Sequence, residues 1–142
     1  MTAMAQSRAF SSNRYVENSL ATASPATLLV MLWDRLVLDL QRAETALGES
    51  DRAGAGAHLK HAQDIVVELQ SSLKADAWEG GPGLSSLYTW LLQELLGAQL
   101  KQDAERVARA RTGIVEPLAD AWRQAALEHL ASGSSASTGG VA

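Results

Sequence analysis

Apolar residues recur along most of the chain at steps of three and four, the period of one face of an α-helix. The first run begins after Ser24 and Pro25, a side chain that can cap a helix and a proline that suits its first turn. It predicts a helix over residues 25–47, ended by Gly48 in the left-handed conformation. Within residues 28–40, ten of thirteen side chains are large and apolar, which is more than one buried face uses.

The same spacing predicts three further helices. The second begins after Ser50 and has a seam that alternates steps of four and three: Ala55, Leu59, Ala62, Val66, Leu69 and Leu73. A glycine-rich break at residues 79–83 precedes the third, whose seam is Leu84, Tyr88, Leu91, Leu95 and Ala98. Asp103 is placed to cap a fourth helix with the seam Val107, Ile114, Leu118 and Trp122, and Pro117 inside it predicts a kink.

Four helices of this length joined by short loops predict an all-α fold, an antiparallel up-down four-helix bundle with a short N-terminal arm or cap segment. Aromatic residues make up only 5% of the chain, a composition that favours helices over strands. We divide the chain into residues 1–22, a mobile arm with an apolar cap segment, residues 23–131, the bundle, and residues 132–142, a disordered tail.

Composition and charge limit the classes of partner that the protein is expected to bind. The net charge is −4, whereas a nucleic-acid-binding protein is expected to carry a basic footprint, so no nucleic-acid partner is expected. The chain has no cysteine, which excludes disulfides and thiolate chemistry. Its most apolar run is too short to cross a bilayer, and its N-terminus lacks the apolar core of a secretory signal. These features predict no membrane insertion and a cytoplasmic location.

Patterns that carry catalysis or bind metals are not found in the sequence. No Glu is followed by His three residues later, as bundle di-iron sites require. His58 and His61 are one helical turn apart without a supporting carboxylate pattern, and we interpret them as surface residues. Arg106, Arg109 and Arg111 favour a solvated basic face over a site for an anionic partner. We therefore predict no catalytic residue, metal, cofactor or small-molecule substrate, and an enzyme is the least favoured class.

The aromatic residues point to a docking surface. Trp33 and Trp90 flank the strongest apolar positions without fitting the simplest seams, so they can line a groove, although residue type alone favours core packing. Trp122 is a core candidate by its position in the fourth seam. Tyr15 lies too far from any seam to be ordinary core, which favours a docking role on a movable arm.

Six short motifs follow one another over residues 14–126. They are Tyr15 with Leu20 and Thr22-Ala-Ser-Pro25, then Leu28 to Asp34, Ala62 to Leu69 with Ser72-Leu73, Leu84-Ser-Ser-Leu-Tyr-Thr-Trp90, Ala98-Gln-Leu100 with Asp103, and Ala121-Trp-Arg-Gln-Ala125. In this order they resemble the flagellin export chaperones of the FliS family. Trp33, Arg35 and Gln99 stand where that family usually has Tyr, Gly and Asn.

The resemblance implies a cytosolic four-helix bundle that binds the C-terminal segment of flagellin, prevents premature polymerisation and presents it to the flagellar type III export gate. It also implies that the N-terminal arm, through Tyr15 and Leu20, covers part of the client groove until the client displaces it. Within this interpretation we predict a set of partner-binding residues: Tyr15, Leu20, Leu29, Leu32, Trp33, Leu36, Leu87, Tyr88, Trp90, Leu91 and Trp122. The alternative is a self-associating helical-bundle adaptor with another helical client, which would use the same apolar surplus.

Overall fold

The computed structural model describes residues 24–77 and 79–139, with side chains up to residue 132, and every element in these ranges is helical. The helices are α2 (Pro25–Gly48), α3 (Arg52–Ser72), α4 (Gly81–Lys101), α5 (Ala104–Ala110) and α6 (Glu116–Gly139). A short 3₁₀ turn, Ala75–Ala77, precedes α4, and a π-helical segment, Arg111–Val115, joins α5 to α6. The fold is an all-α helical bundle, which confirms the predicted fold class.

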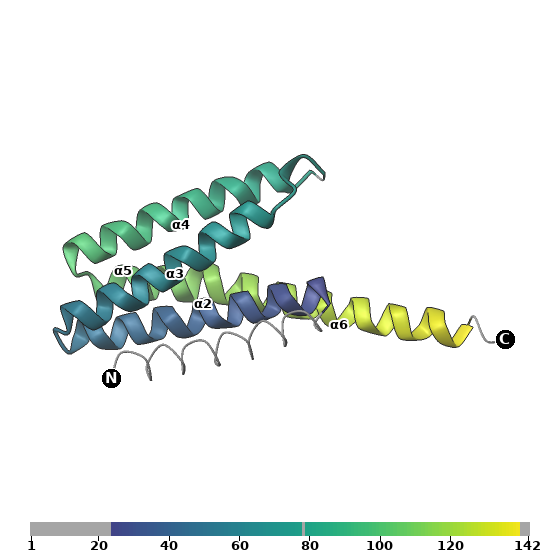
Figure 1. The fold of residues 1–142 in the computed structure, drawn as a ribbon, viewed down its shortest axis with the longest axis horizontal. Coiled ribbons are helices and arrows are strands. Elements are labelled where there is room, and N and C mark those ends of the chain that lie inside the picture. Colours follow the sequence, from purple (N-terminus) through teal and green to yellow (C-terminus); the bar gives the residue numbers. More distant parts are fainter. Residues whose placement is uncertain (1–23, 78, 140–142) are drawn as a thin grey trace, which may run out of the picture.

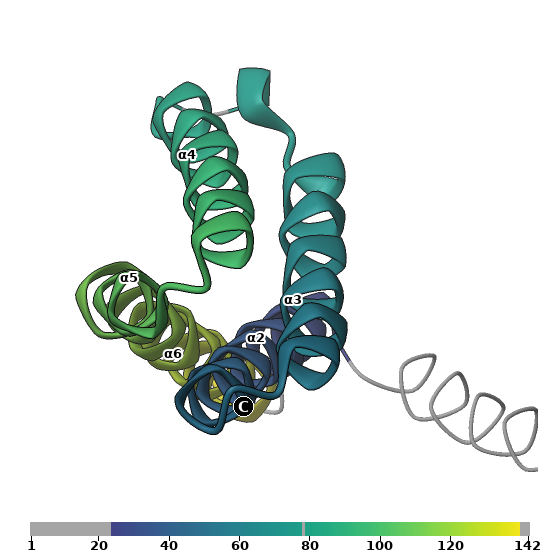
Figure 2. The same cartoon turned by 90° about the vertical axis from the view of Figure 1, so that its left-hand side faces the viewer.

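The helices form two pairs. α2 runs beside α5 and α6, and α3 crosses over α2 to pair with α4 (Figure 1). Towards the end at which α2 begins, the α3–α4 pair diverges from the α2–α6 pair (Figures 1 and 2). The C-terminal part of α6 continues past the other helices (Figure 1). We call the end at which α2 begins the open end.

Two of the predicted caps are confirmed. The Ser24 hydroxyl accepts a hydrogen bond from the Thr27 amide at 3.2 Å, and Pro25 occupies the first turn of α2, where its missing donor costs nothing. The Asp103 carboxylate accepts from the Arg106 amide at 3.0 Å at the start of α5. These local signals therefore fix where α2 and the fourth helical segment begin.

The turn between α2 and α3 differs from the prediction. Gly48 lies inside α2, and the left-handed residue is Ser50, with a φ of 60°. The Asp51 amide donates to the Ala46 carbonyl at 2.8 Å, and the Asp51 carboxylate in turn caps Gly54. Because the closing hydrogen bonds come from residues after Gly48, α2 ends at Gly48, one residue later than predicted.

The predicted loop at residues 79–83 is shorter in the structure, because α4 already begins at Gly81. A side chain at this position would meet the Ala75 carbonyl oxygen at 2.1 Å, so glycine is needed for the close backbone approach of the 3₁₀ turn. Pro82 then stands in the first helical turn, where it is tolerated. The predicted break is thus a tight turn followed by a helix N-terminus.

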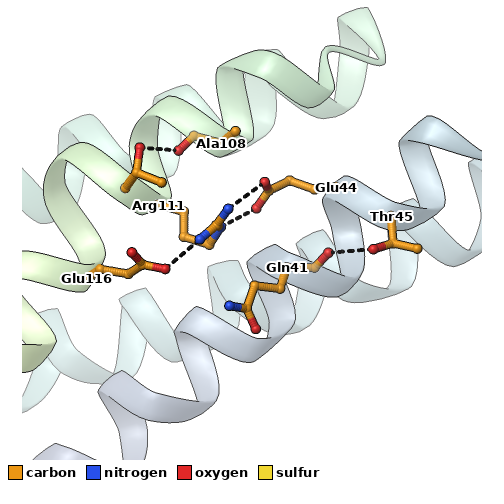
Figure 3. Close-up of polar contacts among 7 residues, drawn as sticks. Gln41, Glu44, Thr45, Ala108, Arg111 and Glu116 are labelled. Carbon is orange, nitrogen blue, oxygen red and sulfur yellow. Dashed lines mark hydrogen bonds and ion pairs between the residues drawn. The ribbon is translucent and has the colours of Figure 1, made fainter.

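The fourth predicted helix contains a π turn rather than a kink at Pro117. The Glu116 amide donates to the Arg111 carbonyl, five residues earlier, and Pro117 becomes the second residue of α6. The Arg111 guanidinium contacts the carboxylates of Glu44 on α2 and Glu116 on α6 (Figure 3). The widened turn removes the need for a donor at Pro117 and so accommodates the proline without ending the helix.

Residues 132–139 prolong α6, where the sequence predicts a disordered tail. Alanine favours a helix, serine tolerates one, and an isolated glycine lowers helix stability by only about 1 kcal/mol. The segment holds no proline, so nothing in it forces the helix to end.

Candidate partner-binding grooves

An apolar groove lies between α2 and α6 at the open end. It has a volume of about 460 Å³ and is lined by Ser24, Pro25, Ala26, Leu29, Trp122, Ala125, Ala126 and His129. Trp122 and Leu29 are half-buried, so each packs on the core with one side and leaves the other exposed. The lining residues of α6 span about two helical turns, which matches a short length of a partner helix.

A second apolar groove adjoins the first on the α3 side of α2. It has a volume of about 290 Å³ and is lined by Pro25, Leu28, Leu29, Leu32, Glu68 and Ser72. Pro25 and Leu29 line both grooves, so they form a ridge that the two share. Together the grooves give the first two turns of α2 apolar surface on both flanks.

The structure places the predicted partner-binding residues in four groups. Leu29, Leu32 and Trp122 line the grooves. Leu87 is half-buried on α4 and Trp90 is 41% exposed there, and neither lines a groove described here. Four others are enclosed in the core: Trp33, Leu36, Tyr88 and Leu91. Tyr15 and Leu20 lie outside the described residues.

The enclosed residues correct the sequence interpretation. Trp33 is fully buried on α2 and its ring meets that of Tyr88 on α4 at a centroid distance of 6.0 Å with a 38° tilt. The pair fills the space between the diverging helix pairs, so Trp33 packs in the core instead of lining a groove. Trp33, Leu36, Tyr88 and Leu91 offer a partner no surface in this arrangement, and partner binding through them stays a prediction that requires the bundle to open.

Some groove residues were missed by the sequence interpretation. Ala125, Ala126 and His129 are too small or too polar to stand out in an apolar pattern. Their signal is the step of three, four and seven residues from Trp122, which keeps them on one side of α6. Leu28 was hidden within the apolar run of α2, where neighbouring leucines mask the phase.

Known proteins resemble this chain in sequence. The sequence model of the family described as flagellar protein FliS matches residues 7–129, most of the chain. The chain belongs to the FliS family. The flagellar secretion chaperone FliS of Salmonella typhimurium is 34% identical over 114 residues, which cover 77% of this chain and 82% of that protein. The Bacillus subtilis protein of the same name is 30% identical over 111 residues, which cover 78% and 82%.

A solved structure supports the fold of this FliS-family chain. A crystal structure of a flagellar chaperone from bacteria superposes with a TM-score of 0.67, covering 86% of this chain and 98% of that one, at 20% identity. Within the described residues, no helix is both long and apolar enough to cross a membrane. In the same residues, no three side chains of the metal-ligating types gather into a possible metal site.

A buried carboxylate ties α2 to α3 in this FliS-family protein. Asp39 is fully buried, and its two oxygens contact the His61 ring nitrogen Nδ1 from α3 and the Arg35 guanidinium at 3.2 Å. A buried carboxylate is costly unless its oxygens are satisfied, so the two partners offset that cost. His61 of α3 therefore has a structural role, because it contacts Asp39 of α2. The sequence interpretation of His61 as a surface residue does not include this contact.

We expect His61→Ala to lower the free energy of unfolding by about 1–3 kcal/mol, because it leaves one buried Asp39 oxygen without a donor. Urea denaturation followed by circular dichroism measures the change. Lys60→Ala is the matched control, since its side chain is exposed and, among the described residues, pairs only with Asp64 within α3. Its expected cost is below about 0.5 kcal/mol. Equal effects of the two substitutions would contradict the proposed contact.

A second ion pair ties α4 to α5. Arg106 donates two hydrogen bonds to Glu94, at 2.9 and 3.0 Å. A side chain at Gly97 would meet the Arg106 guanidinium at 2.4 Å, so the glycine leaves room for the arginine to cross α4. The hydrogen bonds from Arg106 lower the pKa of Glu94 below its ordinary value of 4.5. The predicted solvated basic run is therefore wrong for Arg106 and for Arg111, which both bind carboxylates of other helices.

This lowered pKa gives a pH dependence. Because the folded state holds Glu94 ionised more strongly than the unfolded chain does, its contribution to stability is complete above pH 4.5 and is lost as the pH falls through the lower folded pKa. We expect Arg106→Gln to flatten the fall in stability on acidification below this pH. Urea midpoints of both proteins between pH 7 and pH 3 test this. Parallel curves would show that the pair does not shift the titration.

Proposed function

We propose that this FliS-family protein is a cytosolic export chaperone that binds the C-terminal segment of flagellin, prevents its premature polymerisation and delivers it to the flagellar type III export gate. The observation that carries the proposal is the pair of apolar grooves on either side of α2 at the open end. An amphipathic helix binds by laying its apolar face into such a groove. Relatives named flagellar secretion chaperones support the export role.

Binding and not catalysis is the proposed mode of action. The client segment loses conformational entropy when it orders on the chaperone, so a large covered surface, above about 1,000 Å², is needed to offset that cost. The two adjoining grooves contribute a contiguous apolar floor on α2, with walls from α3 and α6. Half-buried side chains such as Leu28, Leu29 and Trp122 can gain further burial without leaving the core.

The N-terminal arm extends this proposal. Pro25, the first residue of α2, lines both grooves, and Tyr15 and Leu20 belong to the segment that precedes it in the sequence. We propose that these residues occupy groove surface in the free protein and that the client displaces them. A Tyr15→Ala variant is expected to change the affinity or the association rate for the client. Unchanged values of both would remove the arm from the mechanism.

Co-expression tests the main proposal. The partner is the last segment of about 40 residues of a flagellin from the same genome, long enough for about three helices of average length. We expect a stoichiometric complex that survives affinity purification and size-exclusion chromatography, with more helical signal than the two components separately. Failure of the segment to co-purify, with the chaperone folded, would contradict the proposal.

One observation favours the alternative of a self-associating adaptor. Val67 on α3 and Leu96 and Leu100 on α4 are 48%, 50% and 72% exposed. Gln63 and Gln70 of α3 hydrogen-bond to Gln99 and Thr89 of α4, and Val67 lies between the two glutamines on the side of α3 that faces α4. Exposed apolar side chains that gather along one seam are a possible self-association surface. Sedimentation of the isolated protein separates the cases, since a stable symmetric dimer favours the adaptor.

A further inference from the structure

The buried positions of the fourth helical segment change phase at the π turn. Before it, Val107 and Ala110 are buried three residues apart, and after it Val115 and Ala119 are buried four residues apart. Between Ala110 and Val115 the step is five residues, which an uninterrupted α-helix does not place on one face. The π turn therefore rotates α6 by one residue, about 100°, relative to a regular continuation of α5.

This rotation decides which side chains face the core. In a regular helix, Ile114 and Leu118 would stand four and eight residues after Ala110, at the core positions that the heptad pattern of the sequence predicts. In the structure Val115 and Ala119 hold those positions, and Ile114 and Leu118 are half-buried. The predicted seam residues after Ala110 therefore pack at the edge of the core, and the fully buried positions lie one residue later because of the extra residue in the π turn.

The exchange forgoes core burial. Val and Ala side chains together carry four carbon atoms fewer than Ile and Leu, and each buried CH₂ contributes about 0.8 kcal/mol, so up to about 3 kcal/mol is forgone. Local structure that costs stability is concentrated at functional sites, and π turns in particular recur there. What the rotation provides is an apolar stripe along one side of α6, formed by Ile114, Leu118, Trp122 and Ala125 at helical spacing.

One side chain is placed to hold the π turn. Arg111, the first residue of the turn, donates from Nη2 to Glu44 of α2 at 2.9 Å and also contacts Glu116 at the start of α6. Figure 3 shows its guanidinium between the two carboxylates, which come from different helices. Arg111 and Glu44 are each 18% exposed, so solvent screens this pair less than a surface pair. Through Arg111, both ends of the π turn are linked to Glu44 of α2.

We propose that the π turn sets the register of α6 so that Ile114, Leu118 and Trp122 extend the α2–α6 groove, and that Arg111 is the positioning residue that holds this register. The proposal rests on the proposed function for its occupant, the apolar face of the client helix. It deepens that function by naming the α6 side of the binding surface. Arg111 itself need not touch the client.

The absence of cysteine in the sequence allows a test of register that needs no client. Leu118→Cys and Ala119→Cys are made separately in the full chain, and the rate of thiol labelling is measured for each. We expect fast labelling at position 118 and protection at position 119, which is 3% exposed. Each is then combined with Arg111→Gln, or with Arg109→Gln as the matched control, since Arg109 is exposed and its ion pair in the described part of the chain is with Glu105 on its own helix.

A change of register has a signature that unfolding lacks. In the Arg111→Gln background we expect labelling to become faster at position 119, by about tenfold, and slower at position 118, because the two side chains exchange environments. Faster labelling at both positions would mean that Arg111 only stabilises the fold, and unchanged rates would mean that it does not hold the register. Either result overturns the proposal, whatever the client does.

The affinity for the flagellin segment is measured on the same proteins without the cysteines. We expect Arg111→Gln to weaken binding at least about tenfold and Arg109→Gln to leave it unchanged. If the labelling pattern exchanges while affinity stays the same, the α6 stripe is not part of the client site and the proposal is overturned in that part. If the unmodified protein binds no flagellin segment, the proposed function fails while the labelling result still decides the register.

Discussion

Replacing Trp33 by alanine is expected to lower the free energy of unfolding by about 3–5 kcal/mol, the usual cost of removing a large buried aromatic side chain. Trp33 is fully buried and lies between the diverging helix pairs, where its ring meets Tyr88 of α4. Its removal leaves a cavity that the helices can close only by moving together. The change is measured by urea denaturation, and the open end is expected to lose protection from amide exchange first.

Two further substitutions show whether the ring or the polar group matters. Within the described residues the buried indole nitrogen Nε1 of Trp33 has no acceptor, and an unsatisfied buried donor costs about 1–3 kcal/mol. Trp33→Phe removes this penalty together with some area, so its cost is expected to stay below about 1.5 kcal/mol. Trp90→Ala, at a 41% exposed position, is expected to cost about 1 kcal/mol or less. A Trp33→Ala cost as small as that of Trp90→Ala would show that Trp33 is not a core residue.

Burial of Tyr88 in the same cluster has a consequence at high pH. Desolvation raises the pKa of Tyr88 from 10.0 to about 12, since its charged form is poorly accommodated in the core. The unfolded chain ionises first, so the contribution of Tyr88 to stability is complete below pH 10 and is lost as the pH rises towards 12. Ultraviolet titration is expected to resolve this late ionisation, and Trp33→Ala is expected to shift it to lower pH.

The sequence predicted the helices well because their signals are local or periodic. The hydroxyl of Ser24 and the carboxylate of Asp103 act within three residues, and the Ala55 to Leu69 seam of α3 is buried as its spacing predicts. The prediction that Gly48 adopts the left-handed conformation is wrong, because residues other than glycine can also adopt it at the end of a helix. At Ser50, closing hydrogen bonds offset the cost of a positive φ in a residue other than glycine.

The candidate site was predicted less well, because it depends on how the helices are placed relative to one another. An apolar surplus on α2 shows that more surface exists than one face can bury, but it does not show which side chains the diverging α4 leaves uncovered. Residue type favours core packing for Trp33, and its place in the sequence allows a groove position; it lies in the core, whereas Leu29 and Leu32 line a groove. The Asp39–His61 contact joins positions 22 residues apart, beyond any local pattern.

The open end combines limited packing with exposed apolar surface. Trp33 and Tyr88 are buried where the helix pairs separate, and towards the open end Leu28, Leu29 and Trp122 are only half-buried. A surface of this kind stabilises a complex by the apolar area that remains to be buried. Substitutions that leave the core intact but change the groove should therefore change the affinity for the client without changing the stability of the fold.

Ala125→Asp is expected to weaken binding of the flagellin segment by at least about 30-fold, or about 2 kcal/mol, while leaving the fold intact. Ala125 lines the α2–α6 groove and is itself exposed, so the substitution removes no core contact. In the free protein the new carboxylate is hydrated. When an apolar client helix covers the groove, the carboxylate loses its water without gaining a partner, and this desolvation opposes binding. Isothermal titration calorimetry with the purified segment measures the loss.

Ala131→Asp provides the matched control, because it adds the same charge to an exposed position of α6 that lines neither groove. Its affinity should stay within about twofold of the unmodified protein, a difference of about 0.4 kcal/mol. Both variants should show the same urea midpoint, since neither alters the core. If neither substitution changes the affinity, the client does not contact the α2–α6 groove at Ala125. If both substitutions weaken binding equally, the cause is a general effect of negative charge and not a groove contact. Only a loss confined to Ala125→Asp assigns the groove to the client helix.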